Sequence, residues 1–259
     1  SRENLSYSKI NANKLVGDLF SYDEFKTAFD TILGGAGIES YSLSRFDMRF
    51  DSFDPEHYRD YAKLNRYLIS ALAVTYNVQN CYDSRNLFSQ KQLSVAIKNK
   101  RFECENYDKE AESGGRDPAY ARLELRSKCL TSNDIEKQFH GWYIRLDKAL
   151  KNLDKVHQRY NDELEKIYKE EKDAFPVKFR SLTDFLIQYQ NCIFCKAQMI
   201  DLLSRFDEVK NPETRAKNHK KRYGIEYFSK MDVEYAVAEI KRAAEKFFEG
   251  TEMNLFEKS

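Results

Sequence analysis

Long hydrophobic runs are missing from this chain of 259 residues. No stretch approaches the roughly 18 consecutive apolar residues that a membrane-spanning helix requires. The opening residues, SRENLSYSKI, also lack a basic segment followed by an apolar one. The sequence therefore predicts a protein that is neither secreted nor inserted in a membrane, and we expect it in the cytoplasm.

Cysteine is scarce and irregularly spaced. Five cysteines form an odd set without a disulfide framework, which fits free thiols in a reducing cytosol. They are Cys81, Cys104, Cys129, Cys192 and Cys195. The last two make a Cys-x-x-Cys, but a second pair is missing and Ile193 and Phe194 stand between them. This favours buried core cysteines over a zinc or redox site.

Histidine couplets and nucleotide-binding loops are also missing. The histidines are scattered, at His57, His140, His157 and His219, and none forms a His-x-His pair. A nuclease that holds its metal with two neighbouring histidines is therefore not indicated, and a zinc site has no ligand set. No Gly-x-x-x-x-Gly-Lys occurs, which disfavours an intrinsic ATPase. A helicase, if the function needs one, comes from another protein.

Neither sign of charge dominates, because 43 basic residues face 42 acidic ones. Any nucleic-acid contact must come from a local patch. The strongest is 210–222, where six cations accompany Glu213 alone, followed by Tyr223 and Tyr227. The cations are Lys210, Arg215, Lys217, Lys220, Lys221 and Arg222. The stretch suits phosphate contacts and base stacking, but a solvated loop between helices explains it equally well.

The residues that are plentiful are apolar and aromatic. The chain is 41% hydrophobic, with 17 Tyr and 18 Phe against 9 Gly and 4 Pro, which is enough for a packed core. Between about 5 and 130, period-two patterns mix with helical ones, which predicts an α+β domain with a largely antiparallel sheet. Helices are predicted over 21–33, ending at Gly34 and Gly35, and over 55–74, capped by Asp54.

From about 132 the hydrophobic period is helical. It predicts one long helix as far as Pro176, then helices over roughly 181–208 and 226–249. We therefore expect two units. Residues 1–130 form the α+β domain, and residues 131–259 form a helical region that binds DNA or makes a dimer.

Three segments of the first unit alternate strictly between apolar and polar residues: 44–51, 101–109 and 121–128. Alternation of this kind predicts strands with one apolar and one polar face. The polar positions are Arg45, Asp47, Arg49 and Asp51; Glu103, Glu105, Tyr107 and Lys109; and Arg122, Glu124 and Arg126. We expect the three polar faces to form a single surface.

Carboxylates on this surface have two interpretations. Asp47 and Asp51 lie about 13 Å apart along their strand, too far to share one ion. Either of them, joined by Glu105 or Glu124 from neighbouring strands, supplies the hard oxygen ligands that Mg²⁺ or Mn²⁺ prefers. Alternatively, the arginines on the same faces pair with these acids across a solvated sheet.

Tyr107 is a candidate nucleophile because it shares a strand face with Glu105 and Lys109. A phenol attacks poorly at neutral pH unless a metal, a base or a nearby cation assists it, and Lys109 is placed to be that cation. With 17 tyrosines in the chain, however, any single one is more often a packing residue.

The order of these segments resembles the Rep-trans family of rolling-circle plasmid replication initiators, whose relatives include relaxases of integrative conjugative elements. Three motifs carry the resemblance over about residues 8 to 130. They are Arg-x-Asp-x-x-x-Asp at Arg45, Asp47 and Asp51; Arg-Phe-x-x-x-x-Tyr-x-Lys at Arg101, Phe102, Tyr107 and Lys109; and Arg-x-Glu at Arg122 and Glu124. A fourth, INANKL at 10–15, resembles an Asn-rich turn, although Ser8 or Lys9 replaces the usual acidic residue before it.

The resemblance implies an enzyme that nicks and rejoins one strand of origin DNA through a 5′-phosphotyrosine, with Mg²⁺ or Mn²⁺. It implies Tyr107 as the nucleophile, with Lys109 and Arg101 as further catalytic residues. The implied metal site is Asp47, Asp51, Glu124 and Glu105. Expected DNA contacts are Arg45, Arg49, Arg122, Arg126, Arg215, Lys217, Lys220, Lys221 and Arg222.

The implied partners are origin DNA, a second copy of the chain and a host helicase. Origin DNA would offer a single-stranded or hairpin nick site and a double-stranded binding site. One alternative function is a conjugative-element relaxase with the same chemistry. The other is a non-catalytic DNA-binding or scaffold protein, in which the charged strand faces are ion pairs and the long helix is an oligomerisation surface.

Overall fold

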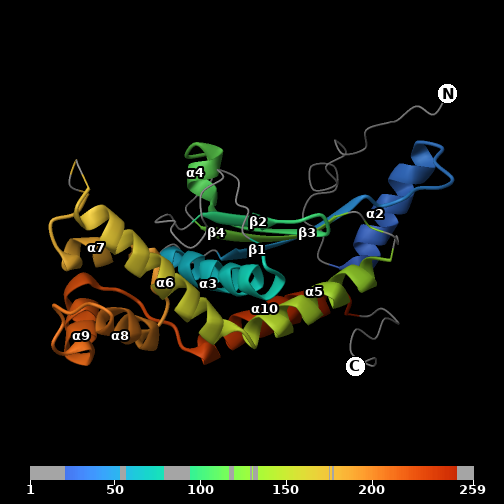
Figure 1. The fold of residues 1–259 in the computed structure, drawn as a ribbon. Helices are drawn as coiled ribbons and strands as arrows, with labels where there is room; N and C mark the ends of the chain where they lie inside the picture. The colour runs from blue at the N-terminus through green and yellow to red at the C-terminus, as the bar shows by residue number, and fades with distance from the viewer. Residues whose placement is uncertain are drawn as a thin grey trace.

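Figure 1 shows the computed structural model, which describes residues 21–52, 57–78, 94–116, 120–128, 130, 134–174, 176 and 178–249. Its strands make one antiparallel sheet, and the chain after the last strand is helical. The expected α+β class, with an antiparallel sheet followed by a helical C-terminal region, is confirmed. The stretch 10–15 and the cap Asp54 lie outside the described residues, as do Cys81 and Cys129.

The sheet has the strand order β1-β4-β3-β2. The three predicted strands are present as β1 (Arg45–Ser52), β3 (Phe102–Asp108) and β4 (Ala121–Lys128). The fourth, β2 (Val95–Lys98), was not predicted, because its first three residues are all buried and a run of four cannot display alternation. The central strands β3 and β4 bring two of the three polar faces directly side by side.

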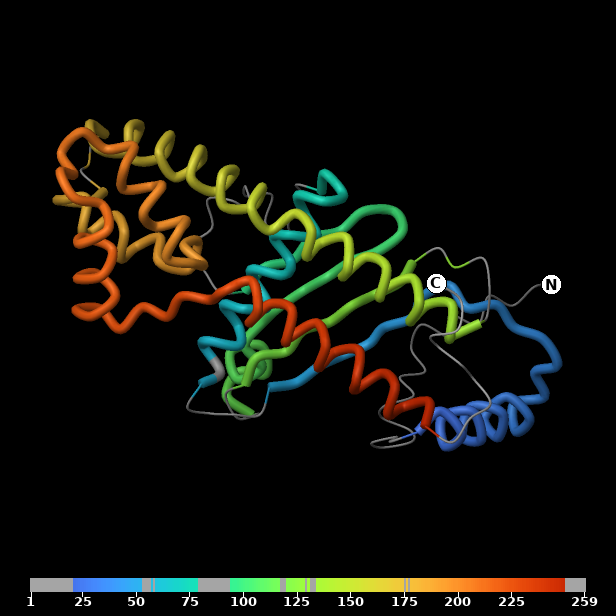
Figure 2. The backbone as a smooth tube through the Cα atoms, turned by 90° about the horizontal axis from the view of Figure 1, so that it is seen from below, coloured from blue at the N-terminus to red at the C-terminus, as the bar shows by residue number. Residues whose placement is uncertain are grey.

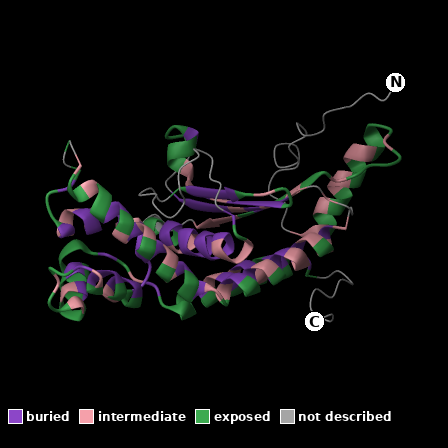
Figure 3. Ribbon diagram, viewed as in Figure 1, coloured by how far each residue is buried: buried purple, intermediate pink, exposed green. Residues whose placement is uncertain are grey.

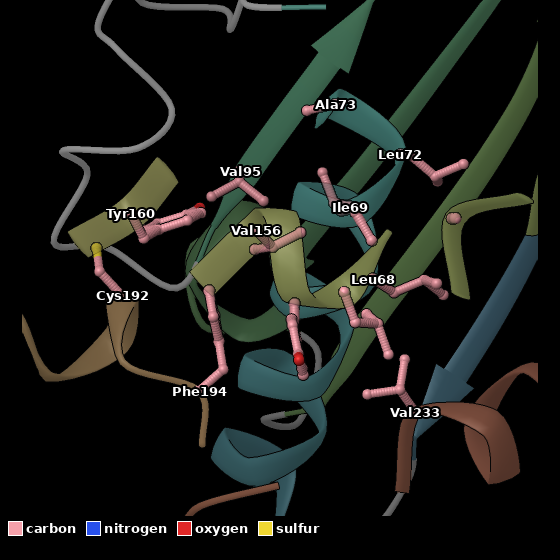
Figure 4. Packing of buried hydrophobic residues seen from close by; sticks show 14 of the residues in the cluster. Leu68, Ile69, Leu72, Ala73, Val95, Val156, Tyr160, Cys192, Phe194 and Val233 are labelled. Carbon is pink, nitrogen blue, oxygen red and sulfur yellow. The ribbon is translucent and has the colours of Figure 1, made fainter. Parts of the chain in front are cut away.

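Helix α3 (Tyr58–Tyr76) covers the apolar face of the sheet and is itself enclosed by later helices. Leu68, Ile69 and Leu72 are at most 1% exposed. In Figure 4 they lie among Val95 of the sheet, Val156 and Val233. Because α3, α5 and α10 all lie on the same side of the sheet (Figure 1), the polar face points away from the helical layer.

The long helix predicted from 132 to 176 is wrong, because the structure has two helices there. Two residues separate the end of helix α5 (Ile135–Leu150) from the start of α6 (Leu153–Lys172). The side-chain amide of Asn152 donates to the carbonyl of Lys148 at 3.0 Å and to Thr75 Oγ1 at 3.1 Å. The break was invisible in the sequence because the apolar spacing continues straight across it.

The helix predicted over 181–208 is also wrong. The segment contains α7 (Leu182–Gln188), a short 3₁₀ turn (Gln190–Cys192) and α8 (Lys196–Ser204). Ser181 and Cys195 each cap a new helix by accepting a hydrogen bond from a backbone N–H. Cys192 and Cys195 are both buried free thiols, as the sequence predicted.

Three further helices, with the short α4 (Lys109–Ser113), complete the described chain. Helix α2 (Tyr22–Gly35) begins at a capping box made by Ser21 and Glu24, close to its predicted start. Helix α10 (Lys230–Phe247) confirms the helix predicted over 226–249. Most of the basic stretch 210–222 is helix α9 (Pro212–Tyr223), so the loop interpretation of that stretch is wrong.

One hydrophobic core joins the two expected units. It runs from Met48 in the sheet to Phe248 after α10, and α3 contacts both the strands and α5, α6 and α10. Figure 3 shows buried residues along α3 and the sheet. In Figure 2, α7, α8 and α9 gather at one end of the molecule and α2 lies at the other. Residue 130 thus separates the strands from the all-helical part of the chain, and a shared core connects them.

Candidate functional site

Three cross-strand rows of polar residues lie on the face of the sheet that points away from α3. Because the side chains of a strand alternate, residues paired across β3, β4 and β1 point to the same side. The rows are Tyr107 with Arg122 and Asp51, Glu105 with Glu124 and Arg49, and Glu103 with Arg126 and Asp47. The structure therefore places residues from all three sequence motifs on one surface, which we call the polar face.

Tyr107 bonds to a carboxylate of the next row. Its hydroxyl donates a hydrogen bond of 2.7 Å to Glu124 Oε1, and its side chain is only partly buried. Burial raises the pKa of Tyr107, and the bond to Glu124 raises it further, whereas the Arg122 guanidinium acts to lower it. The phenol is therefore protonated at neutral pH, with an acceptor for its proton already in contact.

Arg122 is held in place by Asp51 across the β1–β4 pair. Its Nε and Nη2 atoms donate to the two carboxylate oxygens at 2.6 and 2.7 Å. Both side chains are only 10% exposed. Arg122 also donates to the Tyr120 hydroxyl at 3.0 Å. This two-pronged bond raises the pKa of Arg122 and fixes a permanent positive charge beside Tyr107.

Arg126 is surrounded by carboxylates. Its guanidinium contacts Glu103 and Glu124 directly, lies 2.8 Å from Glu105, and lies 3.9 Å from Asp47. Since Glu124 also accepts from Tyr107, the acid cluster and the phenol form one connected network. One cation is thus shared by several anions on the polar face.

The carboxylates around Arg126 fit a divalent cation in their chemistry. Glu103, Glu105 and Glu124 already approach a single positive centre, and carboxylate oxygens are the ligands of Mg²⁺ and Mn²⁺. Within the described residues, however, no three acidic, histidine or cysteine side chains stand close enough together to ligate one ion as they are. An ion would therefore have to replace the Arg126 guanidinium at the centre of these acids.

The metal ligands expected from the sequence are only partly gathered. Glu105 and Glu124 are neighbours across β3 and β4. Asp51 belongs to the Tyr107 row and is bound by Arg122, whereas Asp47 lies beyond Arg126 and pairs with Arg45 at 2.5 Å. The four expected ligands therefore lie in all three rows of the polar face.

Two residues expected beside Tyr107 lie elsewhere. Lys109 is the first residue of α4 (Lys109–Ser113), since the strand ends at Asp108, and its ammonium pairs with Glu112. Arg101 lies in the turn before β3, six residues or about 20 Å of strand from Tyr107. Arg122 takes the position that the sequence assigned to Lys109, as the cation that opposes the rise in the pKa of the phenol.

The residues expected to contact DNA fall into two groups. On the polar face, Arg45 and Arg49 are exposed, but Arg122 and Arg126 are largely buried in their ion pairs. The others lie on α9, at the end of the molecule formed by α7, α8 and α9 (Figure 2). Those residues are Arg215, Lys217, Lys220, Lys221 and Arg222.

Two members of the polar-face network were not selected from the sequence. Glu103 contacts Arg126 and lies 3.3 Å from Lys128, and the Tyr120 hydroxyl contacts Arg122. Alternation had already placed Glu103 on the polar side of its strand. Only the pairing of Glu103 with Arg126 marks it as part of the cluster, and pairing depends on a register that a single strand does not contain.

Comparisons of the chain with protein-family models, with curated proteins and with solved structures give no match. Among the helices of the described segments, none combines the length and the apolar character that a membrane crossing requires.

Proposed function

We propose that this protein cuts one DNA strand by forming a covalent bond between Tyr107 and the 5′-phosphate at the cut. The observation that carries the proposal is the hydrogen bond of 2.7 Å from the Tyr107 hydroxyl to Glu124, on the polar face and beside Arg122. A tyrosine nucleophile needs a base and a nearby positive charge, and this arrangement supplies both.

Glu124 and Arg122 have separate roles in the proposed reaction. Glu124 accepts the phenol proton as the Tyr107 oxygen attacks phosphorus, and the bond from phosphorus to the 3′-oxygen of the preceding nucleotide breaks. That 3′-oxygen takes a proton from water and leaves as a hydroxyl. Attack of the same hydroxyl on the phosphotyrosine reverses each step and rejoins the strand. Arg122 offsets negative charge that builds up on the phosphate.

A divalent ion would be held by Glu105 and Glu124, with Glu103 as a third ligand. When bound, it supplies polarisation of the scissile phosphate and stabilises the departing oxygen. Asp51 acts indirectly, because its bond to Arg122 fixes the position of that guanidinium.

The setting we propose is rolling-circle replication of a plasmid or similar element in the cytoplasm. The partners would be origin DNA, a second copy of the chain and a host helicase. Support comes from the order and spacing of the three motifs, each of which contributes at least one residue to the polar face. A conjugative-element relaxase would use the same chemistry on a transfer origin.

The test is a denaturing gel that detects protein joined to a labelled single-stranded or hairpin oligonucleotide in the presence of Mn²⁺. We expect an adduct with the unaltered protein and none with Tyr107→Phe. Tyr235→Phe is the matched control, because that phenol is 63% exposed on α10, and its adduct yield should be unchanged.

Glu124→Gln should slow adduct formation roughly 100-fold or more, because it removes the proton acceptor.

A second candidate is a DNA-binding or scaffold protein without catalysis. The observation that favours it is that Asp51 and the acids around Arg126 already have arginine partners, so ion pairing alone accounts for the polar face. Binding of oligonucleotide without any adduct, in Mg²⁺ and in Mn²⁺, would support this candidate. An adduct that persists in Tyr107→Phe would contradict the proposed nucleophile.

A further inference from the structure

A second polar site lies far along the chain from Tyr107, between α7 and α9. It is a groove of about 690 Å³. The residues that line it are Thr183, Asn211, Thr214, Arg215, Asn218, His219, Lys221, Arg222 and Tyr223. Three of them are cations and none is an aspartate or glutamate. A groove whose described lining offers hydroxyl, amide and cationic donors and no carboxylate suits an anion.

His219 lines this groove as a buried imidazole whose polar atoms the described fold leaves without hydrogen bonds. The residue is only 4% exposed, and neither ring nitrogen has a hydrogen-bond partner among the described residues. Burial, and secondarily the charge of Arg215, lowers its pKa to about 4, so the ring is neutral at pH 7. A buried polar group without a partner is costly, and such a group in a folded protein calls for an explanation. A ligand that enters the groove would provide one.

A hydrogen bond holds the Arg215 side chain in the lining of the groove. Its Nη2 atom donates to Thr183 Oγ1 at 3.2 Å, which ties α9 to α7 across the opening. It lies one helical turn before His219, so both side chains project from the same side of α9. A guanidinium with several donors, held beside a hydroxyl and an imidazole, matches the tetrahedral oxygens of a phosphate group.

We propose that this groove binds a backbone phosphate of a nucleic acid, with Thr183, Arg215 and His219 as its principal contacts. The groove is open to solvent, and Lys221 and Arg222 of its lining add positive charge to that of Arg215, which favours a strand of phosphates. Tyr223, 37% exposed at its end, offers a ring for base stacking. The proposal does not depend on the chemistry of Tyr107.

The first test is fluorescence anisotropy with a labelled oligonucleotide, as a single strand and as a duplex. Arg215→Gln should weaken binding of at least one form about tenfold, the effect of losing one charge-assisted contact. Lys217→Gln is the matched control, because it removes the same charge from the same helix outside the groove, and should cost about twofold or less. Equal losses in the two variants, or no loss in either, would overturn the groove as the binding site.

His219→Leu provides a second variant that is expected to fold. It removes two buried nitrogens without partners, so the thermal unfolding temperature should stay the same or rise. Its affinity for the oligonucleotide should still fall about threefold to tenfold. Unchanged affinity would remove His219 from the site and contradict the proposal.

Inorganic phosphate separates the two sources of a phosphate group. The nitrogen resonances of His219 should shift when the oligonucleotide is added to the full chain, and inorganic phosphate should compete only at far higher concentration. If inorganic phosphate alone shifts these resonances and the oligonucleotide does not, the groove binds a free anion and the nucleic-acid proposal fails.

Discussion

Arg126 shows how much a single side chain organises on the polar face. Its guanidinium contacts Glu103, Glu105 and Glu124. Glu124 also accepts the hydrogen bond from the Tyr107 hydroxyl. Without that positive charge, three carboxylates would repel each other at close range. In the proposed chemistry, Arg126 holds these acids together until a divalent ion takes its place.

His219 gives a prediction about pH. Its folded pKa of about 4 lies below the ordinary value of 6.5, so between these pH values the unfolded chain binds the extra proton. His219 therefore has no effect on the pH dependence of stability above pH 6.5, and the folded protein loses stability as the pH falls from 6.5 towards 4. The expected loss is roughly 2–3 kcal/mol.

The measurement is urea unfolding of the unaltered protein and of His219→Leu at pH 7 and at pH 4.5. Losses from other titrating groups are common to both proteins and cancel in the comparison. The unaltered protein should lose more stability than the variant. Identical losses would mean that His219 titrates normally in the folded protein.

At the scale of elements, the bond from Arg122 to Asp51 fastens the edge strand β1 to β4. Asp51→Ala would leave a guanidinium that is 10% exposed without its carboxylate, and should lower the free energy of unfolding by about 2–4 kcal/mol. Asp47→Ala is the control on the same strand. Its carboxylate is 39% exposed and pairs with a half-exposed arginine, so the cost should be about 0–1 kcal/mol.

Chemical denaturation followed by circular dichroism measures both variants. Asp51→Leu combined with Arg122→Met should recover much of the lost stability, since replacing both partners leaves no buried charge. If Asp51→Ala and Asp47→Ala cost the same, the bond between Arg122 and Asp51 contributes no more than an exposed ion pair.

Elements with a local signal were predictable from the sequence, and those without one were not. β3 and β4 were found because strict alternation needs only neighbouring residues. The break at Asn152 and the new helix that begins at Cys195 depend on side-chain bonds to Thr75 and Gln198. Such bonds override a helical period that continues unchanged through both positions.

At the scale of the whole molecule, the sequence predicted which residues lie on the polar face but not the hydrogen bonds and ion pairs between them. The sides on which Tyr107 and Glu124 lie follow from alternation, whereas their hydrogen bond depends on the register of β3 with β4. The groove was beyond prediction, because Thr183 and Arg215 come into contact only after α7 and α9 pack at one end of the fold. Lys109 was misplaced because β3 ends one residue before it.

The central claim is that Tyr107 itself bonds to DNA. Trypsin cuts after Arg101 and Lys109, so residues 102–109 form one peptide, FECENYDK, in which Tyr107 is the only tyrosine. After reaction with a single-stranded oligonucleotide and nuclease trimming, mass spectrometry should find this peptide carrying the mass of a nucleotide joined through phosphate. Finding the nucleotide on a different tyrosine peptide, or on none, would contradict the claim.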